Sequence, residues 1–360
     1  MSANWGRQLR LTLFGESHGP AIGIVIDGLP AGLSLDWTAI RRDMARRAPG
    51  QSRMTTSRKE ADEVHILSGL YEDKTTGAPL CAQIVNTNTR SQDYANLARV
   101  PRPGHADFTG AVRYGGYNDP RGGGPFSGRL TAPLVFAGAV ARGYLGSKGI
   151  QAAAAIDRIG RVADGLPEKP DFDRLRQLAE RPLAVYHEAV QPAMQREILE
   201  AREALDSVGG SITCYAWGLP AGLGEPFFGG VESVLAGLLY AIPAVKGVEF
   251  GDGFGLSSQR GSVANDAYEV QDGRVVTATN HHGGLLGGIT SGMPLRVRVG
   301  IKPTPSISQP QRSVNLDTLE TVPLVIEGRH DPCIVTRAVP VVEACVLLGL
   351  MDLYLEAQTR

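Results

Sequence analysis

The chain has 360 residues, 42% of them hydrophobic, which is enough to form the core of one large domain or two ordinary ones. Its 36 basic and 37 acidic residues give a formal net charge of -1, which excludes an overall field that attracts nucleic acid or an anionic membrane. A site for an anion must therefore come from a local concentration of arginine.

The cysteines and the N-terminal residues exclude further classes. The four cysteines form no C-x-x-C pair, so neither a disulfide framework nor a metal site is predicted. The N-terminus lacks a charged and then apolar signal pattern, and the most apolar run, 131–145, is shorter than the ~20 residues of a membrane span. We therefore expect a cytoplasmic protein that contacts no membrane and no nucleic acid.

The first predicted strand, Ile22–Asp27, is a β-branched run that ends at a Gly-Leu-Pro turn. Asp36 is expected to cap a helix whose apolar residues recur at helical spacing and which ends at Pro49-Gly50. A further helix is predicted from about Thr131.

The second half of the chain also contains predicted helices and strands. The polar stretch 161–210 is predicted to be a solvent-facing helical excursion that includes a helix over Met194–Val208. Alternating apolar residues from Ile212 to Ala216 predict a half-buried strand, and Leu295–Ile301 predicts another. Val339–Leu355 is apolar almost all round, so this closing helix is expected inside the molecule.

One hexapeptide occurs twice. Gly28–Leu33 and Gly218–Leu223 both read Gly-Leu-Pro-Ala-Gly-Leu, each after a strand-like run and before a helix-like one. This repetition indicates duplicated strand-turn-helix units within one fold. Because strands and helices do not alternate regularly, we expect an α+β fold with antiparallel sheets and a separate helical layer, in a single domain over 1–360.

The segment Gly15–Gly19 matches the G-x-S-x-G pattern of a serine hydrolase. That nucleophile turn needs a helix directly after it, whereas Pro20 and a β-branched run follow here. A glycine-flanked turn is the simpler interpretation, in which His18 beside Ser17 could transfer protons. A serine esterase using Ser17 stays an alternative.

Four other loops carry polar or ionisable side chains between glycines and prolines. The run 119–129 contains three consecutive glycines, whose N–H groups can face an anion, and Ser127 and Arg129 add donors. Walker and Rossmann patterns are absent. The other three are Arg102–Asp107, Lys302–Ser306 and Gly328–Pro332. Together these loops predict an enzyme that binds a multiply anionic small molecule and moves protons with histidine; a flavin-binding protein without catalysis is a further alternative.

These loops, in this order, resemble the chorismate synthase family along nearly the whole chain. The resemblance rests on eight segments: Phe14–Gly19, Arg90–Tyr94, Arg102–Asp107, Arg121–Gly124, Lys246–Phe254, Gly287–Gly292, Lys302–Ser306 and Gly328–Cys333. It implies a 1,4-elimination that converts 5-enolpyruvylshikimate 3-phosphate to chorismate and phosphate in aromatic amino acid biosynthesis. It also implies reduced FMN as cofactor, helices sandwiched between two antiparallel sheets, and a homotetramer. The chain is similar to the shorter members, which receive reduced flavin from an external reductant.

The resemblance also implies roles for particular residues. His18 matches the histidine that protonates reduced flavin, with Ser17 beside it; His105 matches the one that protonates the departing phosphate, and Asp331 the aspartate linked to proton removal at the flavin. Ser127 is expected among both the catalytic groups and the flavin contacts. The arginines that match substrate-anion positions are Arg47, Arg53, Arg102, Arg129 and Arg329, of which Arg47 and Arg53 also match NADP positions. The expected flavin contacts are Pro125, Phe126, Ser127, Pro243, Ala244, Gly287, Lys302, Pro303, Thr304, Pro305, Ser306 and Arg329.

Three departures from the family pattern stand out. Many members read Arg-Ser-Ser-Ala-Arg where this chain has Pro125–Arg129, so one arginine and one serine are lost beside the flavin. The usual three-arginine run reads Arg46-Arg47-Ala48, which leaves two registers for one substrate arginine. The segment 114–120 is one residue longer than in common versions.

Overall fold

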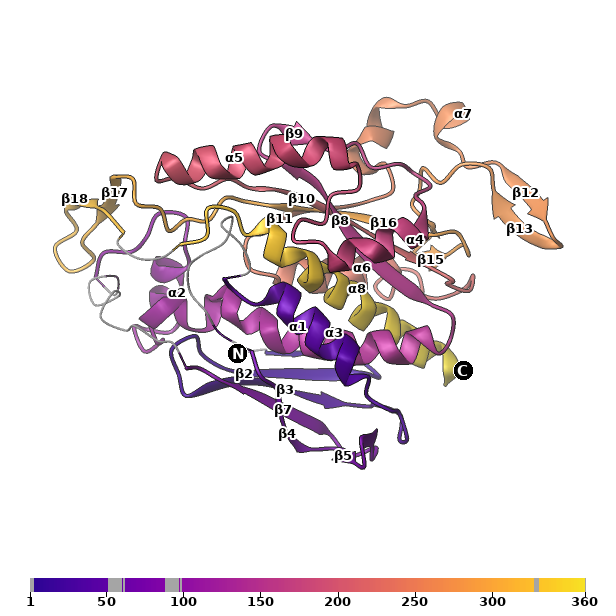
Figure 1. Ribbon diagram of the computed structural model, residues 1–360, viewed down its shortest axis with the longest axis horizontal. Coiled ribbons are helices and arrows are strands. Elements are labelled where there is room, and N and C mark those ends of the chain that lie inside the picture. The colour runs from indigo at the N-terminus through magenta and orange to yellow at the C-terminus, as the bar shows by residue number, and fades with distance from the viewer. Residues whose placement is uncertain are drawn as a thin grey trace.

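Two antiparallel sheets enclose a layer of helices in the computed structural model, which describes residues 3–50, 60, 62–87, 97, 99–326 and 330–359 (Figure 1). The first five-stranded sheet has the order β1 (Asn4–Trp5), β2 (Arg10–Gly15), β3 (Ala21–Asp27), β7 (Leu80–Val85), β4 (His65–Ser68). The second has the order β11 (Val245–Phe250), β16 (Leu295–Ile301), β10 (Gly210–Trp217), β8 (Gln151–Ile159), β9 (Val162–Ala163). The α+β prediction, with helices between two antiparallel sheets, is therefore confirmed.

Four helices form the middle layer, and shorter elements extend from the ends. The middle helices are α1 (Trp37–Arg47), α3 (Thr131–Gly146), α6 (Val231–Ala241) and α8 (Val335–Gln358). The remaining α-helices are α2 (Asp107–Arg113), α4 (Phe172–Gln177), α5 (Gln191–Glu203) and α7 (Gly261–Ala264). The two-stranded hairpins are β5 (Leu70–Tyr71) with β6 (Lys74–Thr75), β12 (Tyr268–Gln271) with β13 (Arg274–Thr277), β14 (Leu285–Leu286) with β15 (Ile289–Thr290), and β17 (Gln311–Val314) with β18 (Thr321–Leu324).

The predicted duplication is present in the strand order and in the register. The sheet order β2-β3-β7-β4 in the first half corresponds to β8-β10-β16-β11 in the second, and all these pairs are antiparallel. In both halves the hexapeptide directly follows the second strand of this order and precedes a helix, which is α1 in the first half and α6 in the second. The strand pairs β3–β7 and β10–β16 have the same register. Ala21 is paired with Val85 and Ile26 with Leu80 in one sheet, and Ser211 is paired with Gly300 and Ala216 with Leu295 in the other.

The two hexapeptides are held by the same hydrogen bonds, which explains why their sequence repeats. Thr75 donates through Oγ1 to the proline carbonyl of the first copy (2.6 Å) and accepts from the N–H of its last leucine (2.9 Å). Thr290 does the same for the second copy, at 2.7 and 2.9 Å. The first glycine of each copy has a positive φ, 86° at Gly28 and 75° at Gly218, a conformation that favours glycine.

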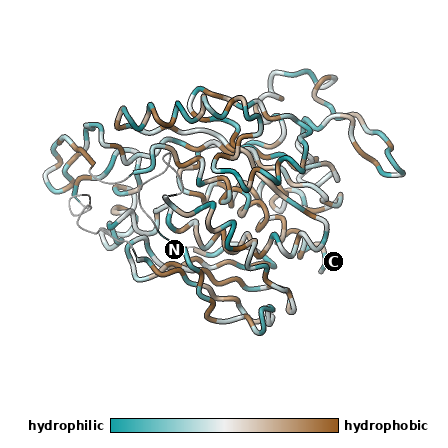
Figure 2. The backbone as a smooth tube through the Cα atoms, in the orientation of Figure 1, coloured by the Kyte–Doolittle hydropathy of each residue, from teal (hydrophilic) through white to brown (hydrophobic). Residues whose placement is uncertain are grey.

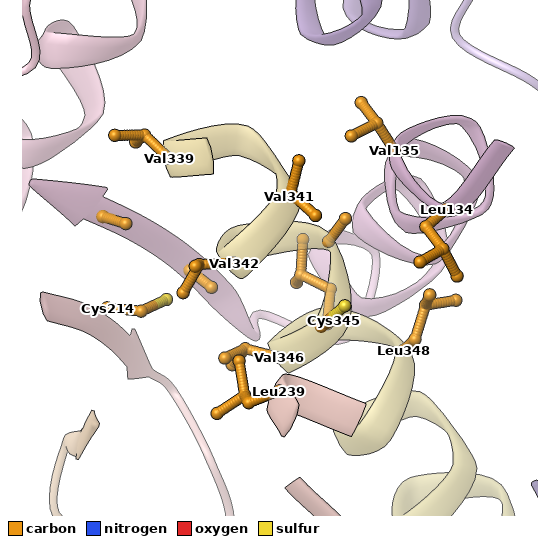
Figure 3. Packing of buried hydrophobic residues seen from close by; sticks show 14 of the residues in the cluster. Leu134, Val135, Cys214, Leu239, Val339, Val341, Val342, Cys345, Val346 and Leu348 are labelled. Atoms are coloured by element: carbon orange, nitrogen blue, oxygen red, sulfur yellow. The ribbon is translucent and has the colours of Figure 1, made fainter. Parts of the chain in front are cut away.

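Helix α8 is the centre of the core. By length and composition this helix could span a membrane, but most of its apolar stretch is buried inside the molecule. Figure 3 shows Val342 and Val346 on the side of the strand that carries Cys214, and Leu348 on the side of α3. Figure 2 shows hydrophobic segments gathered in this middle layer. The predicted internal closing helix is confirmed, although it begins at Val335 rather than at residue 339.

Three expectations for the region 161–217 were wrong. Helix α5 ends at Glu203, before Val208, because Leu205 takes a positive φ of 56° and Asp206 N–H donates back to the carbonyl of Ala201. The stretch 161–210 is a covering layer on the second sheet, since several of its apolar side chains are at most 1% exposed: Leu175, Leu178, Leu183, Met194 and Ile198. Strand β10 is consequently buried on both faces and not on one.

A buried ion network joins α1, α3 and α8. The Glu343 carboxylate, 2% exposed, accepts from Arg46 at 2.7 and 2.9 Å, from Arg142 at 2.8 Å and from the N–H of Ala154 at 3.0 Å. Asp43 accepts from Nε of Arg142 at 2.9 Å. Burial raises the pKa of Glu343, but the two guanidinium groups outweigh it and bring that pKa down to about 2.

Replacing Glu343 by Gln should lower the free energy of unfolding at pH 7 by about 3–5 kcal/mol, because two buried guanidinium groups lose their counter-charge. The folded-state pKa lies below the ordinary 4.5, so this contribution is complete above pH 4.5 and is lost as the pH falls toward 2. Denaturant unfolding at several pH values measures it. The control Glu188→Gln removes an exposed pair with Arg181 and should cost less than about 1 kcal/mol. Equal stabilities of Glu343→Gln and wild type at pH 7 would contradict this account.

Candidate active site

A cavity of about 700 Å³ lies where corresponding connections of the two halves meet. The connection from β7 to α3 contributes residues between Arg102 and Thr131, and the connection from β16 to α8 contributes residues between Lys302 and Asp331. These connections contact each other, because Ser313 Oγ donates to the carbonyl of Pro101 at 2.5 Å. Both lie at the left of Figure 1, beside α2 and the β17–β18 hairpin. The C-terminal ends of α1 and α6 complete the wall.

The turn between β2 and β3 carries Ser17 and His18. Their exposed fractions are 1% and 7%, and His18 Nδ1 lies 3.3 Å from Ser17 Oγ. Asn86, at the end of β7, donates to the carbonyls of Glu16 and Gly19 at 3.0 and 2.8 Å and so fixes the turn. Strand β3 follows this turn instead of a helix, so the geometry of a hydrolase nucleophile turn is not present.

His105 is held by a carboxylate and an arginine. Its Nδ1 lies 2.6 Å from Asp107 Oδ1, and Asp107 also accepts from Nε and Nη2 of Arg102 at 2.7 Å each. Burial by itself raises the pKa of Asp107, but the hydrogen bonds from Arg102 and His105 outweigh it and hold that pKa far below its ordinary value. An ionised Asp107 favours a proton on Nδ1, which leaves Nε2 of His105 to exchange protons.

The glycines of the loop 121–126 pack against both histidines. A Cβ on Gly122 would lie 2.0 Å from Nδ1 of His18, and one on Gly123 would lie 3.1 Å from Cε1 of His105. Both glycines have a positive φ, 62° and 92°. The loop therefore fits between the two rings only because it lacks side chains.

Arg47 and Arg129, which both line the cavity, meet at one buried carboxylate. Asp62 accepts from Nη1 of Arg47 at 2.7 Å and from Nη1 of Arg129, and Glu60 lies 3.4 Å from the same nitrogen of Arg129. Burial raises the pKa of Asp62, but the two arginines outweigh it and lower the pKa below its ordinary value. Burial also lowers the pKa of Arg47 to about 10, so Arg47 is still a cation at neutral pH.

The structure places Arg47, and not Arg46, at the cavity. Arg46 points into the helical layer, where it pairs with Glu343, whereas Arg47 lines the cavity wall. Of the two registers left open by the sequence, the structure therefore favours the one that has Arg47 at the cavity.

Arg337 is a cavity residue that the sequence analysis missed. It lies in the first turns of α8, donates through Nη1 to Asp331 at 2.5 Å and through Nε to the carbonyl of Arg47 at 3.0 Å. Tyr240, Lys246 and Glu60 also line the cavity without having been predicted. Arg337 follows Asp331 by six residues, so its place beside that loop could have been inferred from a helix beginning near residue 335.

Most of the expected flavin contacts line this one cavity: Pro125, Phe126, Ser127, Pro243, Ala244, Lys302, Thr304, Pro305 and Ser306. Pro303 lies within the same segment but does not line the wall. Gly287 is in the turn of the β14–β15 hairpin, away from the cavity and at the other side of Figure 1. Arg53 and Arg329 lie outside the described residues.

Two buried donors at the cavity are left for a ligand. Nη2 of Arg129 and Oγ1 of Thr304 have no hydrogen-bond partner within the part of the chain that the structure describes. Buried polar atoms are nearly always paired, so these two fit an anionic or hydroxyl-bearing ligand. Ser127 Oγ, by contrast, accepts from the N–H of Arg129 at 3.2 Å and caps the short helix that follows.

The charge of the wall favours a ligand with several negative groups. Among the described residues, six basic side chains line the cavity (Arg47, Arg102, Arg129, Arg337, Lys246 and Lys302), against the two carboxylates of Glu60 and Asp331. Burial, together with the nearby Lys246, lowers the pKa of Lys302. Within the described ranges there is no group of three or more His, Cys, Asp or Glu side chains that could hold a metal ion.

Comparisons with known proteins show the family of the chain. The family model described as chorismate synthase matches residues 9–355. The chain belongs to the chorismate synthase family. It is 47% identical over 357 residues to a chorismate synthase of Dehalococcoides mccartyi, covering 99% of this chain and 98% of that one. It is also 47% identical over 347 residues to one of Thermococcus kodakarensis, covering 96% of each.

A solved structure supports the fold. A crystal structure of a chorismate synthase superposes with a TM-score of 0.75 at 28% sequence identity, covering 98% of this chain and 93% of that one. Membership of the family makes the protein a carbon–oxygen lyase acting on a phosphate ester, which forms chorismate in the shikimate pathway to aromatic amino acids. The serine esterase and the non-catalytic flavin-binding protein are thereby set aside.

Replacing Gly122 by Ala should slow chorismate formation by ~10²-fold, because the added Cβ would displace the His18 ring and reacting groups tolerate little displacement. Steady-state rates measure it, with circular dichroism as a check on folding. Gly143→Ala is the control, since nothing lies within 4 Å of a Cβ at that exposed position of α3. A wild-type rate in Gly122→Ala would show that the close approach to His18 does not matter.

Proposed function

We propose that the cavity binds 5-enolpyruvylshikimate 3-phosphate beside reduced FMN, and that His18, His105 and Asp331 move protons there. The observation that carries the proposal is the convergence of six basic side chains, two unpaired buried donors and the His105 ring on one cavity. The substrate has two carboxylates and a phosphate, and such a polyanion needs this kind of lining in a protein of net charge -1.

The arginines would hold the substrate anions. Arg129 can offer the unpaired Nη2, and Arg102 is kept in place by its two-point contact with Asp107. Arg337 lines the cavity beside Asp331 and adds a cation that the sequence had not indicated. The roles of Arg53 and Arg329 in anion binding, and of Arg47 and Arg53 toward NADP, stay predictions of the resemblance.

The flavin would lie against the segments 125–127, 243–244 and 302–306, which line the cavity except for Pro303. Thr304 Oγ1 is an unpaired donor there, which fits a phosphate or a ring oxygen of such a cofactor. Lys302 adds a positive charge on the same wall, which favours the anionic character of a reduced flavin. Reduced FMN, when bound, would supply an electron to the substrate and take back a hydrogen.

The proton transfers can be assigned to particular atoms. As an imidazolium, with Nδ1–H held by Asp107, His105 would give the proton on Nε2 to the departing phosphate and become neutral. His18 would protonate the reduced flavin, with its ring oriented by Ser17 and by the close contact of Gly122. Asp331 would accept a proton from the flavin, with Arg337 holding its carboxylate at 2.5 Å.

The assembly and the source of electrons are further proposals that rest on the family resemblance: a cytoplasmic homotetramer supplied with reduced flavin by an external reductant. The projecting arm that includes α7 and the β12–β13 hairpin supports self-association (Figure 1). It presents large hydrophobic side chains to solvent, since Phe254 is 85% exposed, Val270 76% and Tyr268 67%. Exposed apolar side chains that gather on one projection are typical of contacts between protein chains.

Protein mixed with chemically reduced FMN and the substrate, without oxygen, should release phosphate and generate the diene absorbance of chorismate. His18→Ala and His105→Ala should each slow this by roughly 10²–10⁴-fold, the usual cost of losing an acid–base group. NADPH in place of the chemical reductant should give no product, because the proposal assigns flavin reduction to another protein.

The proposed reaction, the proton-transfer roles and the external reductant can each be contradicted by a separate result. No product with folded wild-type protein would overturn the proposed reaction. Wild-type rates in both histidine variants would overturn the proton-transfer roles alone, and product with NADPH would overturn the external reductant alone.

A further inference from the structure

One buried carboxylate, on Asp62, joins two of the basic residues at the cavity. Its side chain is completely buried, and its two oxygens accept from different arginines: Oδ2 from Nη1 of Arg47 at 2.7 Å, and Oδ1 from Nη1 of Arg129. The Asp62 carboxylate therefore bridges the end of α1 and the short helix after the glycine loop.

The bridge fixes which donors are left for a ligand. Arg47 donates from all three of its nitrogens to the protein: Nε to Thr131 (3.2 Å), Nη1 to Asp62 and Nη2 to the carbonyl of Gly128 (2.9 Å). Arg129 donates through Nε to Asn86 at 3.1 Å and through Nη1 to Asp62, which leaves the buried Nη2 unpaired. One nitrogen of the pair is thus directed to a ligand, and the others hold the guanidinium groups in place.

We propose that Asp62 is a positioning residue: an internal counter-anion that holds Arg47 and Arg129 at fixed orientations and leaves Nη2 of Arg129 as the donor for the substrate anion. This inference rests on the proposed function, in which the cavity takes a phosphate-bearing substrate. Without Asp62, the single charge of Glu60, 3.4 Å from Nη1 of Arg129, would not neutralise two buried guanidinium groups, which would repel each other and turn toward any anion that enters.

The proposal predicts opposite effects on anion binding and on turnover. Removing the negative charge of Asp62 removes a repulsion toward the incoming anion and frees a guanidinium donor, so an anion should bind more tightly. The freed arginine would no longer be held in the productive orientation, so turnover should fall. A residue needed only for stability would not tighten anion binding.

The test compares Asp62→Asn with wild-type protein in the absence of flavin, by calorimetric titration with inorganic phosphate. Asp62→Asn should bind phosphate about tenfold more tightly, and its kcat for chorismate formation should fall by ~10²-fold. Equal or weaker phosphate binding in Asp62→Asn, including no binding in either protein, would overturn the proposal, and so would a wild-type kcat.

Asp43→Asn is the matched control. Asp43 is 3% exposed, against 4% for Asp62, and it too bonds more than one arginine, Arg142 and Arg42 among them. Its arginine partners, Arg42, Arg46 and Arg142, do not line the cavity, whereas Arg47 and Arg129 do. Its replacement should lower the melting temperature as Asp62→Asn does, while leaving phosphate affinity at the wild-type value. Tighter phosphate binding in Asp43→Asn as well would show that loss of any buried carboxylate suffices, and would overturn a specific role for Asp62.

If Asp62→Asn does not fold, Asp62→Glu is the variant that tests the proposal. It keeps the negative charge and adds one methylene, so it should bind phosphate as the wild type does but turn over more slowly because both arginines are displaced. Wild-type turnover in Asp62→Glu would overturn the positioning role. The phosphate titration uses neither flavin nor substrate, so a failure of the proposed reaction would appear only in the turnover assay.

Discussion

Burying arginine side chains beneath a cavity is the constraint on which this structure depends. A guanidinium group away from water needs a counter-charge or a full set of acceptors, and the protein meets this need with acids placed beside the arginines. Asp62 accepts hydrogen bonds from Arg47 and Arg129, Asp107 accepts from Arg102, and Asp331 accepts from Arg337. The positive lining is thus preserved for a ligand even though the chain as a whole is almost neutral.

The internal duplication explains why the loops that form this site come from distant parts of the sequence. Corresponding strands in the two halves share one order and one register, so the connection after β7 and the connection after β16 end at the same side of the molecule. Each connection then leads into a helix of the middle layer, α3 or α8, and these two pack closely at Gly138 and Ala344. Packing of the helical layer therefore sets the separation of the two sets of loops, and a shift in one half would change the cavity itself.

The sequence was sufficient for the fold class, the duplicated turn and the family, but not for the pairing of charges. Asp36 capping α1 is a local signal, and the structure shows its carboxylate accepting from two N–H groups at 3.0 Å. Local signals could not show that Arg46 and Arg47, one residue apart, point to different partners, because Glu343 and Asp62 come from distant segments. The extent of α5 was overestimated because its apolar spacing continues past Leu205, where only the backbone conformation ends the helix. Contacts of high sequence separation decided the pairing of charges, whereas the end of α5 was decided by the local backbone.

The central claim is that one cavity, made by both halves, holds the substrate and the flavin together. A crystal structure of the protein with oxidised FMN and the substrate tests this most directly. We predict that both ligands occupy the 700 Å³ cavity, with Nη2 of Arg129 and Oγ1 of Thr304 each within hydrogen-bond distance of a ligand atom. Ligands bound elsewhere, or bound in the cavity with both of these donors still unpaired, would contradict the account.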